Sequence, residues 1–270
     1  MQQAIAFLDS GVGGLTVVKE VMRQLPRERI AYFGDTARAP YGPRSAEEVV
    51  SFTREIVDYL VRFDPKMIVI ACNTATAAAL RDIRTRVSLP VIGVINPGAR
   101  AAIHRTRFGI VGVIGTEGTV KSRAYDLALT RLNPDVKVVS RACPSFVPLV
   151  EDGNFHSEDA YSIVEETLRP MRQSGIDCLI LGCTHYPFLA DCISEAMGPG
   201  VALINSAEET AREIRDVLTE NDTLATGSEP PEHRFLCSGD PKKFRAIAEE
   251  WLGVPIHVAP VLWRVPNFGT

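Results

Sequence analysis

Two cysteines in equivalent positions are the residues of this sequence best suited to chemistry. Cys72 follows the apolar run MIVIA and Cys183 follows CLILG, and polar residues at the start of an expected helix come next in both cases. Aligning DPKMIVIACNTA with GIDCLILGCTHY places the two thiols opposite each other, which indicates a weak internal repeat. A helix N-terminus is expected to lower a thiol pKa, so that the thiolate, a base or a nucleophile, forms near neutral pH. A single cysteine after a strand more often packs in the core, but two equivalent ones favour a site.

Two such thiols allow a specific reaction if they flank one small molecule. One thiolate can remove a proton from one face of a carbon atom while the other thiol returns a proton to the opposite face. His185 lies two residues beyond Cys183 and is placed to act with that thiol, although a lone histidine there would more often be a helix cap. The pattern therefore predicts acid–base catalysis with inversion at carbon.

Polar residues that could hold the ligand follow the same kind of strand. In an open α/β sheet, ligands bind outside the carboxyl ends of the strands, where backbone N–H groups and helix N-termini converge. The residues expected at that edge are Asp9, Ser10, Asn73, Thr74, Thr184 and His185. Glycines at positions 11, 13 and 14 would let the backbone approach a ligand. They do not complete a dinucleotide-binding fingerprint, because Thr16 holds the place of the third glycine.

Two loops carry further candidate residues. The stretch FGDTARAPYGPRS contains Tyr41 and Gly42, and PSFVPLVEDGNF contains Glu151 beside Asp152. Each stretch is consistent with a connector or polar turn, and equally with a loop that closes a site.

The elements that position these residues follow a recurring order of short apolar runs and helix-periodic segments. This order is typical of βα units on a mostly parallel sheet, and it predicts an α/β fold. Strands are expected near residues 4–8, 30–33, 67–71, 91–95, 109–114, 136–140, 178–182, 201–204 and 234–237, with helices between them. Ser45 and Glu48 have the spacing of a capping box, and Pro187 and Gly198 mark the two ends of a later helix. The stretch SGDPKKFRAIAEEWLG has the same end signals.

The length of the chain favours two domains. Its 270 residues exceed a typical domain of roughly 100 to 200 residues. Pro97 and Gly98 interrupt the alternation within INPGARAAI, and a second crossing is expected near Asn205. We therefore expect one domain from residues 1–96 plus 208–270 and another from residues 97–207.

The composition excludes several classes of protein. A net charge of −4 argues against broad attraction to nucleic acid or to an anionic membrane. The N-terminus lacks a basic region, and no window approaches the roughly 18 apolar residues that a membrane span needs, so we expect a cytoplasmic protein. The six cysteines contain no CxxC pair, so neither a zinc ribbon nor a thioredoxin-like motif is predicted and no metal is expected.

Six segments in the same order resemble the bacterial glutamate racemases of the cofactor-independent aspartate/glutamate racemase superfamily. The resemblance covers nearly the whole chain. The segments are DSGVGGLTV at 9–17, YFGDTARAPYG at 32–42, ACNTATA at 71–77, GTEGTV at 115–120, PLVEDG at 148–153 and LGCTHYP at 181–187.

The resemblance implies a fold, a reaction and a role for each candidate residue. The implied fold is two doubly wound, pseudo-symmetric α/β domains with the active site in the cleft between them, frequently in a homodimer. Cys72 and Cys183 would be the two acid–base thiols that interconvert L- and D-glutamate, with Asp9 assisting the first thiol and Glu151 and His185 the second. The residues implied to bind the amino acid are Asp9, Ser10, Tyr41, Gly42, Asn73, Thr74, Thr184 and His185. No pyridoxal phosphate or other cofactor is implied, and the biological role is supply of D-glutamate for peptidoglycan and so for cell shape.

Two departures and several alternatives stand beside this interpretation. Asn96 and Asn205 occupy places where acidic residues are common in the family, which bears on fine tuning of the site or hinge. An aspartate or hydantoin racemase of the same superfamily, or an isomerase with a single cysteine nucleophile, is an alternative enzyme. A protein that binds DNA gyrase is an alternative of another class.

Overall fold

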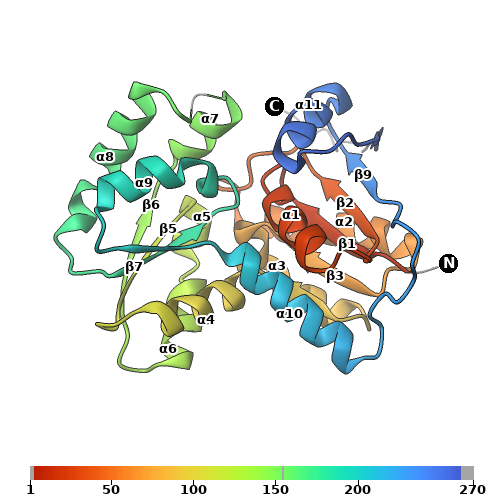
Figure 1. Cartoon of the computed structure of the whole chain (residues 1–270), viewed down its shortest axis with the longest axis horizontal. Coiled ribbons are helices and arrows are strands. Elements are labelled where there is room, and N and C mark those ends of the chain that lie inside the picture. The colour runs from red at the N-terminus through yellow and green to blue at the C-terminus, as the bar shows by residue number, and fades with distance from the viewer. Residues whose placement is uncertain (1–2, 154, 263–270) are drawn as a thin grey trace.

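The computed structural model describes residues 3–153 and 155–262, which form two parallel β-sheets with helices on both faces (Figure 1). The first sheet has the order β10 (Val258–Pro260), β9 (Arg234–Cys237), β2 (Ile30–Gly34), β1 (Ile5–Asp9), β3 (Met67–Ile70) and β4 (Val91–Gly93). The second has the order β6 (Lys137–Ala142), β5 (Ile110–Gly115), β7 (Cys178–Gly182) and β8 (Ala202–Ile204). The predicted α/β class with two mostly parallel, doubly wound units is confirmed.

Helices cover the two faces of each sheet. Those beside the first sheet are α1 (Leu15–Gln24), α2 (Ala46–Leu60), α3 (Asn73–Arg86), α10 (Ser206–Glu220) and α11 (Pro241–Leu252). Those beside the second are α4 (Ile95–Arg105), α5 (Glu117–Lys121), α6 (Ala124–Leu132), α7 (Phe146–Glu151), α8 (Glu158–Arg172) and α9 (Ala190–Met197). Short 3₁₀ turns, η1 (Val61–Phe63) and η2 (Tyr186–Leu189), extend or precede helices.

The core explains why the strands have continuous apolar sequences. Ile5 and Phe7 of β1 pack in one buried cluster with α1 and α11, while Ala6 and Leu8 pack in the cluster on the other face with α2 and α3. A parallel strand that is covered on both faces needs apolar side chains at successive positions. The nine strands expected from the sequence are confirmed, with ends that differ by at most two residues.

Local signals set the helix ends. Ser45 accepts a hydrogen bond from the Glu48 N–H at 3.2 Å, and Glu48 accepts one from the Ser45 N–H at 3.1 Å, so the capping box of α2 is confirmed. Asp240 caps α11 by accepting from the Lys242 N–H at 2.8 Å, and Gly253 ends that helix with φ of +73°.

The structure differs from the sequence-based expectations at three places. It contains β10, which the sequence does not predict, because a strand of three residues at the sheet edge carries little periodicity. Pro97 and Gly98 do not interrupt the fold but lie in the first turns of α4, where the proline lacks only an N–H that has no partner within the helix. The helix expected after Cys183 begins as η2 and continues as α9.

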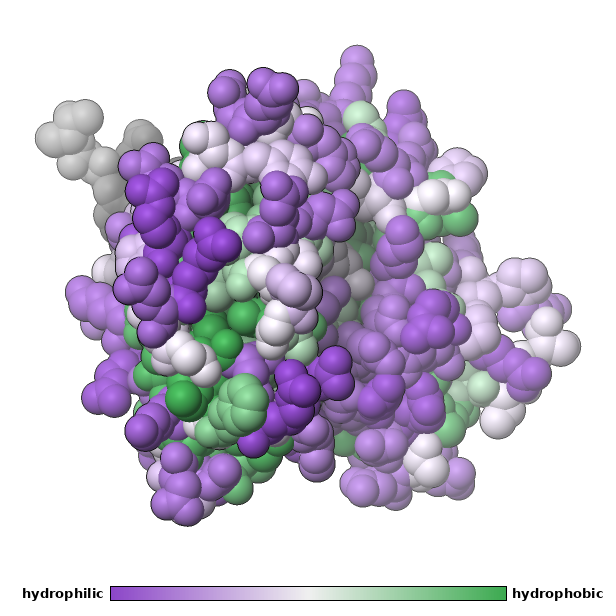
Figure 2. Space-filling view, turned by 60° about the vertical axis from the view of Figure 1, so that its left-hand side comes forward, coloured by the Kyte–Doolittle hydropathy of each residue, from purple (hydrophilic) through white to green (hydrophobic). Residues whose placement is uncertain are grey.

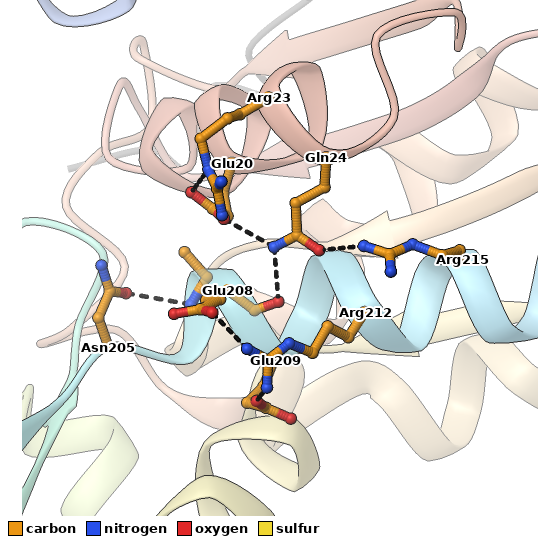
Figure 3. Close-up of polar contacts among 9 residues, drawn as sticks. Glu20, Arg23, Gln24, Asn205, Glu208, Glu209, Arg212 and Arg215 are labelled. Atoms are coloured by element: carbon orange, nitrogen blue, oxygen red, sulfur yellow. Dashed lines mark hydrogen bonds and ion pairs between the residues drawn. The ribbon is translucent and has the colours of Figure 1, made fainter.

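The chain passes from the first sheet to the second through α4 and returns through α10. Asn205 accepts a hydrogen bond from the Ala207 N–H at 3.0 Å, so this departure from the family pattern is a good N-cap. Gln24 of α1 donates to the Glu208 carbonyl at 3.3 Å and accepts from Arg215 at 2.5 Å, which joins α1 to α10 (Figure 3). The domain boundaries at residues 96 and 207 stay a prediction.

The surface is mostly hydrophilic on the face seen in Figure 2, with smaller hydrophobic areas between the polar side chains. None of the helices in the described part of the chain is long and apolar enough to cross a membrane.

Candidate active site

The two cysteines line one cavity at the carboxyl ends of both sheets. Cys72 follows β3 and caps α3, and Cys183 follows β7 and precedes η2. Both are buried, with 6% and 7% of their surface exposed. Other predicted residues that line the same cavity are Ser10, Tyr41, Gly42, Asn73, Thr74, Glu151, Thr184 and His185. Asp9, which is fully buried, does not line it. The structure thus brings these predicted residues together, although they come from five separate segments.

The surroundings of Cys72 keep its thiol protonated. Its sulfur accepts from the Ala75 N–H at 3.4 Å, and its S–H donates to Ser10 Oγ at 3.7 Å. Burial, followed by the nearby Asp9 carboxyl, raises the pKa of the Cys72 thiol to about 12. The expectation of a lowered thiol pKa is therefore wrong for Cys72, because loss of hydration outweighs the partial charge of the helix N-terminus.

Asp9 is the last residue of β1, and its charge acts on Cys72 although it does not line the cavity. Its Oδ2 accepts from the Gly11 N–H at 2.9 Å. Burial raises the pKa of the Asp9 carboxyl, and the charge of His185 opposes that shift.

Cys183 has a different neighbour, a cationic histidine. Its Sγ lies 3.8 Å from His185 Nδ1, and His185 Nε2 lies 3.3 Å from Glu151 Oε1. Burial opposes the charged imidazole, but Cys183, Glu151 and Asp9 outweigh it and raise the pKa of His185 to about 10. The histidine in turn lowers the pKa of Glu151.

Hydrogen bonds hold the loop that carries Tyr41 and Gly42 in place. The Tyr41 hydroxyl donates to the Asp35 carboxylate, which also accepts from Arg38 Nε at 2.7 Å. The hydrogen of the Tyr41 hydroxyl is therefore donated to Asp35, although Tyr41 itself lines the cavity. Gly42 accepts from the Gly118 N–H at 3.0 Å, which connects this loop to α5.

Sequence reasoning missed several lining residues, among them Thr116 and Val147. Thr116 Oγ1 lies 2.9 Å from Thr74 Oγ1, so a hydrogen bond between these hydroxyls joins the half of the molecule with the first sheet to the half with the second. Thr116 directly follows β5 and caps α5, and the rule that selected Asn73 and Thr184 would have found it. Val147 has no such signal.

Gly13 allows the two halves of the molecule to pack closely against each other. A Cβ there would lie 2.3 Å from Thr184 Oγ1 and 2.7 Å from His185 Nδ1. The expected close approach is thus to protein side chains of the second sheet.

Among the residues described, no group of three or more His, Cys, Asp or Glu side chains could hold a metal ion. The fold and the site define a two-sheet α/β protein with two cysteine thiols in one cavity at the carboxyl ends of the strands.

Comparison with known proteins identifies the family. Residues 13–214 match the family model for Asp/Glu/Hydantoin racemase, and the chain belongs to this family. It is therefore a racemase, which is an isomerase. The glutamate racemase of Bacillus cereus is 54% identical over 257 residues, covering 95% of this chain and 96% of the relative. That of Listeria monocytogenes serotype 4a is 55% identical over 255 residues, covering 94% and 96%.

Solved structures agree with the sequence comparison. A glutamate racemase isoform from Bacillus anthracis superposes with a TM-score of 0.94 at 49% identity, covering 96% of this chain and 97% of the other. The glutamate racemase of Francisella tularensis in complex with D-glutamate gives a TM-score of 0.90 at 36% identity, covering 96% and 97%.

Proposed function

We propose that this protein is a cofactor-independent glutamate racemase that interconverts L- and D-glutamate with two cysteines. The observation that carries the proposal is that Cys72 and Cys183, from equivalent positions of two sheets, line one buried cavity. The glutamate racemases at 54% and 55% identity support glutamate as the substrate.

The proposed reaction is a proton exchange with inversion. One thiolate removes the Cα proton of glutamate, and the thiol on the other side delivers its own proton to the opposite face of Cα. The product leaves with the protonation states of the two sulfurs exchanged, so the reverse reaction starts from that state. His185 lies 3.8 Å from the Cys183 sulfur and next to Glu151, while burial raises the pKa of Cys72 and keeps it a thiol. In this proposal Asp9 assists Cys72, and His185 with Glu151 assists Cys183.

Substrate binding in this proposal depends on neutral hydrogen-bond donors and on His185, which also lines the cavity. The described residues that line the cavity include no arginine or lysine. Backbone N–H groups at Gly42, the Asn73 amide and the hydroxyls of Ser10, Thr74 and Thr184 can bind the two carboxylates. Helix N-termini next to these groups add favourable partial charge.

The cavity must widen before glutamate can bind. Its volume is about 20 Å³, and a single water molecule already needs about 10–15 Å³ of such space. We therefore expect the loops at the ends of the two sheets to separate for substrate entry and to close around it.

The cellular context is also a proposal, and it rests on the resemblance to bacterial glutamate racemases. D-Glutamate from this reaction would supply peptidoglycan synthesis and so maintain cell shape. The protein would act in the cytoplasm as a homodimer. Sedimentation analysis of the purified protein tests the dimer.

The deciding experiment is proton NMR of L-glutamate in D₂O with the purified protein after exhaustive dialysis against chelator, together with chiral analysis. Loss of the Cα proton signal as D-glutamate accumulates is the expected result. The same measurement with aspartate and with a substituted hydantoin tests the other substrates in the family description. Exchange of aspartate but not of glutamate would overturn the substrate, and no exchange with any of the three would overturn the reaction.

A further inference from the structure

A tyrosine outside the cavity lining contacts a residue inside it. Tyr125 of α6 donates from its hydroxyl to Asn73 Oδ1, at the start of α3, at 2.7 Å. Both residues are buried, with 2% and 3% of their surface exposed. Because α6 belongs to the second sheet and α3 to the first, this hydrogen bond joins the two halves of the molecule next to Cys72.

The bond gives the Asn73 amide a defined direction. An amide has an acceptor oxygen on one side and two N–H donors on the other. With Oδ1 bound to Tyr125, Nδ2 is buried and has no hydrogen-bond partner among the residues that the structure describes. An unpaired buried donor is unfavourable, and Asn73 lines the cavity with both cysteines. A carboxylate oxygen in that cavity is the partner that these donors fit.

The position of the tyrosine ring is fixed by two glycines. A Cβ on Gly182, directly before Cys183, would lie 3.1 Å from Tyr125 Cε2. A Cβ on Gly98 of α4 would lie 3.3 Å from the Tyr125 hydroxyl oxygen. The ring therefore packs closely on the backbone of β7 and α4, and its hydroxyl has little room to move.

We propose that Tyr125 is a positioning residue that holds the Asn73 amide with its N–H₂ group toward a substrate carboxylate, and that it does so only when the two halves of the molecule are together. This inference rests on the proposed function. Without the phenol, the amide can turn so that its oxygen faces the carboxylate, which is repulsive. Separation of the halves breaks the same bond, so substrate binding and closure favour each other.

The first test is the Tyr125→Phe variant. Loss of the phenol is expected to raise KM about tenfold for both enantiomers with kcat changed less than about twofold, because the interaction acts on binding and not on proton transfer. Tyr186→Phe is the matched control. The Tyr186 hydroxyl is also fully buried and donates to the Cys143 carbonyl at 2.9 Å, but it does not touch Asn73. An equal rise of KM in the control, or no rise in Tyr125→Phe, would overturn the inference.

A double-mutant cycle separates positioning from a general effect on packing. In an Asn73→Ala background, Tyr125→Phe is expected to have no further effect on kcat/KM, because its target is gone. The same fold-loss in both backgrounds contradicts the proposal. If Tyr125→Phe does not fold, Gly98→Ala replaces it in the cycle. Its added Cβ would lie 3.2 Å from Ser206 Cβ and 3.3 Å from the Tyr125 hydroxyl oxygen, which is tight enough to shift the hydroxyl by a few tenths of an ångström. Wild-type turnover of glutamate is measured alongside: an inactive wild type would refute the proposed function itself, whereas additivity in an active protein refutes only this inference.

Discussion

At the residue scale, the two cavity thiols differ in the charges beside them. Cys72 lies near the buried Asp9 carboxyl, while Cys183 lies 3.8 Å from a cationic imidazole. A two-base reaction needs both sulfurs, so we expect Cys72→Ser and Cys183→Ser each to lower racemisation by about 10²- to 10⁴-fold in either direction. Each variant is expected to retain solvent exchange of the one enantiomer whose Cα proton faces the remaining thiol. Proton NMR in D₂O with each enantiomer measures both effects.

The control for these variants is Cys178→Ser. Cys178 is also buried, but it lies within β7 and packs with the core on the face of the second sheet that α4 and α6 cover. Its replacement is expected to leave turnover within about threefold, since a single thiol-to-hydroxyl change in a core mainly lowers stability. Full racemisation by Cys72→Ser or by Cys183→Ser would contradict a mechanism that needs two bases.

A pH-dependent stability is also expected from a single residue, His185. Its pKa is about 10 in the folded protein and 6.5 as a reference for the unfolded chain. A group whose pKa is raised by folding stabilises the protein fully below the unfolded value and loses that effect as pH rises through the folded value. The difference in free energy of unfolding between wild type and His185→Asn should therefore be constant below pH 6.5 and shrink between pH 6.5 and 10.

Urea unfolding at several pH values measures this difference. His104→Asn, at an exposed position of α4, is the control and should show no comparable trend. A gap between wild type and His185→Asn that stays unchanged up to pH 10 would mean that the imidazole is not held as a cation.

At the scale of elements, the start of α1 is packed against the end of β7. Because a Cβ at Gly13 would lie 2.3 Å from Thr184 Oγ1, Gly13→Ala must displace either the α1 loop or the segment that carries Thr184 and His185. A displacement near 1 Å at reacting groups lowers rate by roughly a hundredfold, and we expect a loss of kcat/KM of that order. Gly11→Ala, in the same loop but with nothing within 4 Å of the added Cβ, should keep most activity. Equal activities of the two variants would contradict this account of the contact.

At the scale of the whole molecule, a buried ion pair secures the chain where it returns to the first sheet. Lys66 Nζ lies 2.6 Å from Glu28 Oε2, and the two side chains are 5% and 2% exposed. Lys66 also donates to the Thr223 carbonyl at 2.6 Å, and Glu28 accepts from the Ala225 N–H at 2.8 Å. The pair thus holds the segment that follows α10 against the strands on which the site is built.

Removal of one partner should be costly for this reason. Lys66→Met leaves the Glu28 charge buried without its cation, and we expect a loss of about 3–5 kcal/mol in free energy of unfolding. Arg212→Met removes the exposed pairs of α10 with Glu208 and Glu209 and should lose no more than about 1 kcal/mol. Urea denaturation of both variants gives the comparison. Similar losses would show that burial does not increase the contribution of the Lys66–Glu28 pair to the free energy of unfolding.

The sequence alone predicted most of the fold, because the relevant signals are local. Strands covered on both faces require apolar runs, and Ser45 and Asp240 stand where helix ends need acceptors. The three-residue β10 was missed, since a short edge strand leaves almost no pattern. In the site, the rule that polar residues after parallel strands share one edge brought Cys72 and Cys183 together correctly.

Only the tertiary structure decided the properties that depend on residues far apart in the chain. The pKa of Cys72 follows from its burial beside Asp9, and sequence reasoning about a helix N-terminus gave the wrong direction. The meeting of Gly13 with Thr184, and of Tyr125 with Asn73, depends on how the two sheets are placed against each other. The sequence by itself determined which elements form and which side chains stand at their ends, because hydrogen bonding and apolar periodicity act over a few residues. The environment of each side chain was decided by packing between segments, because hydration and electrostatic interaction depend on distance in space.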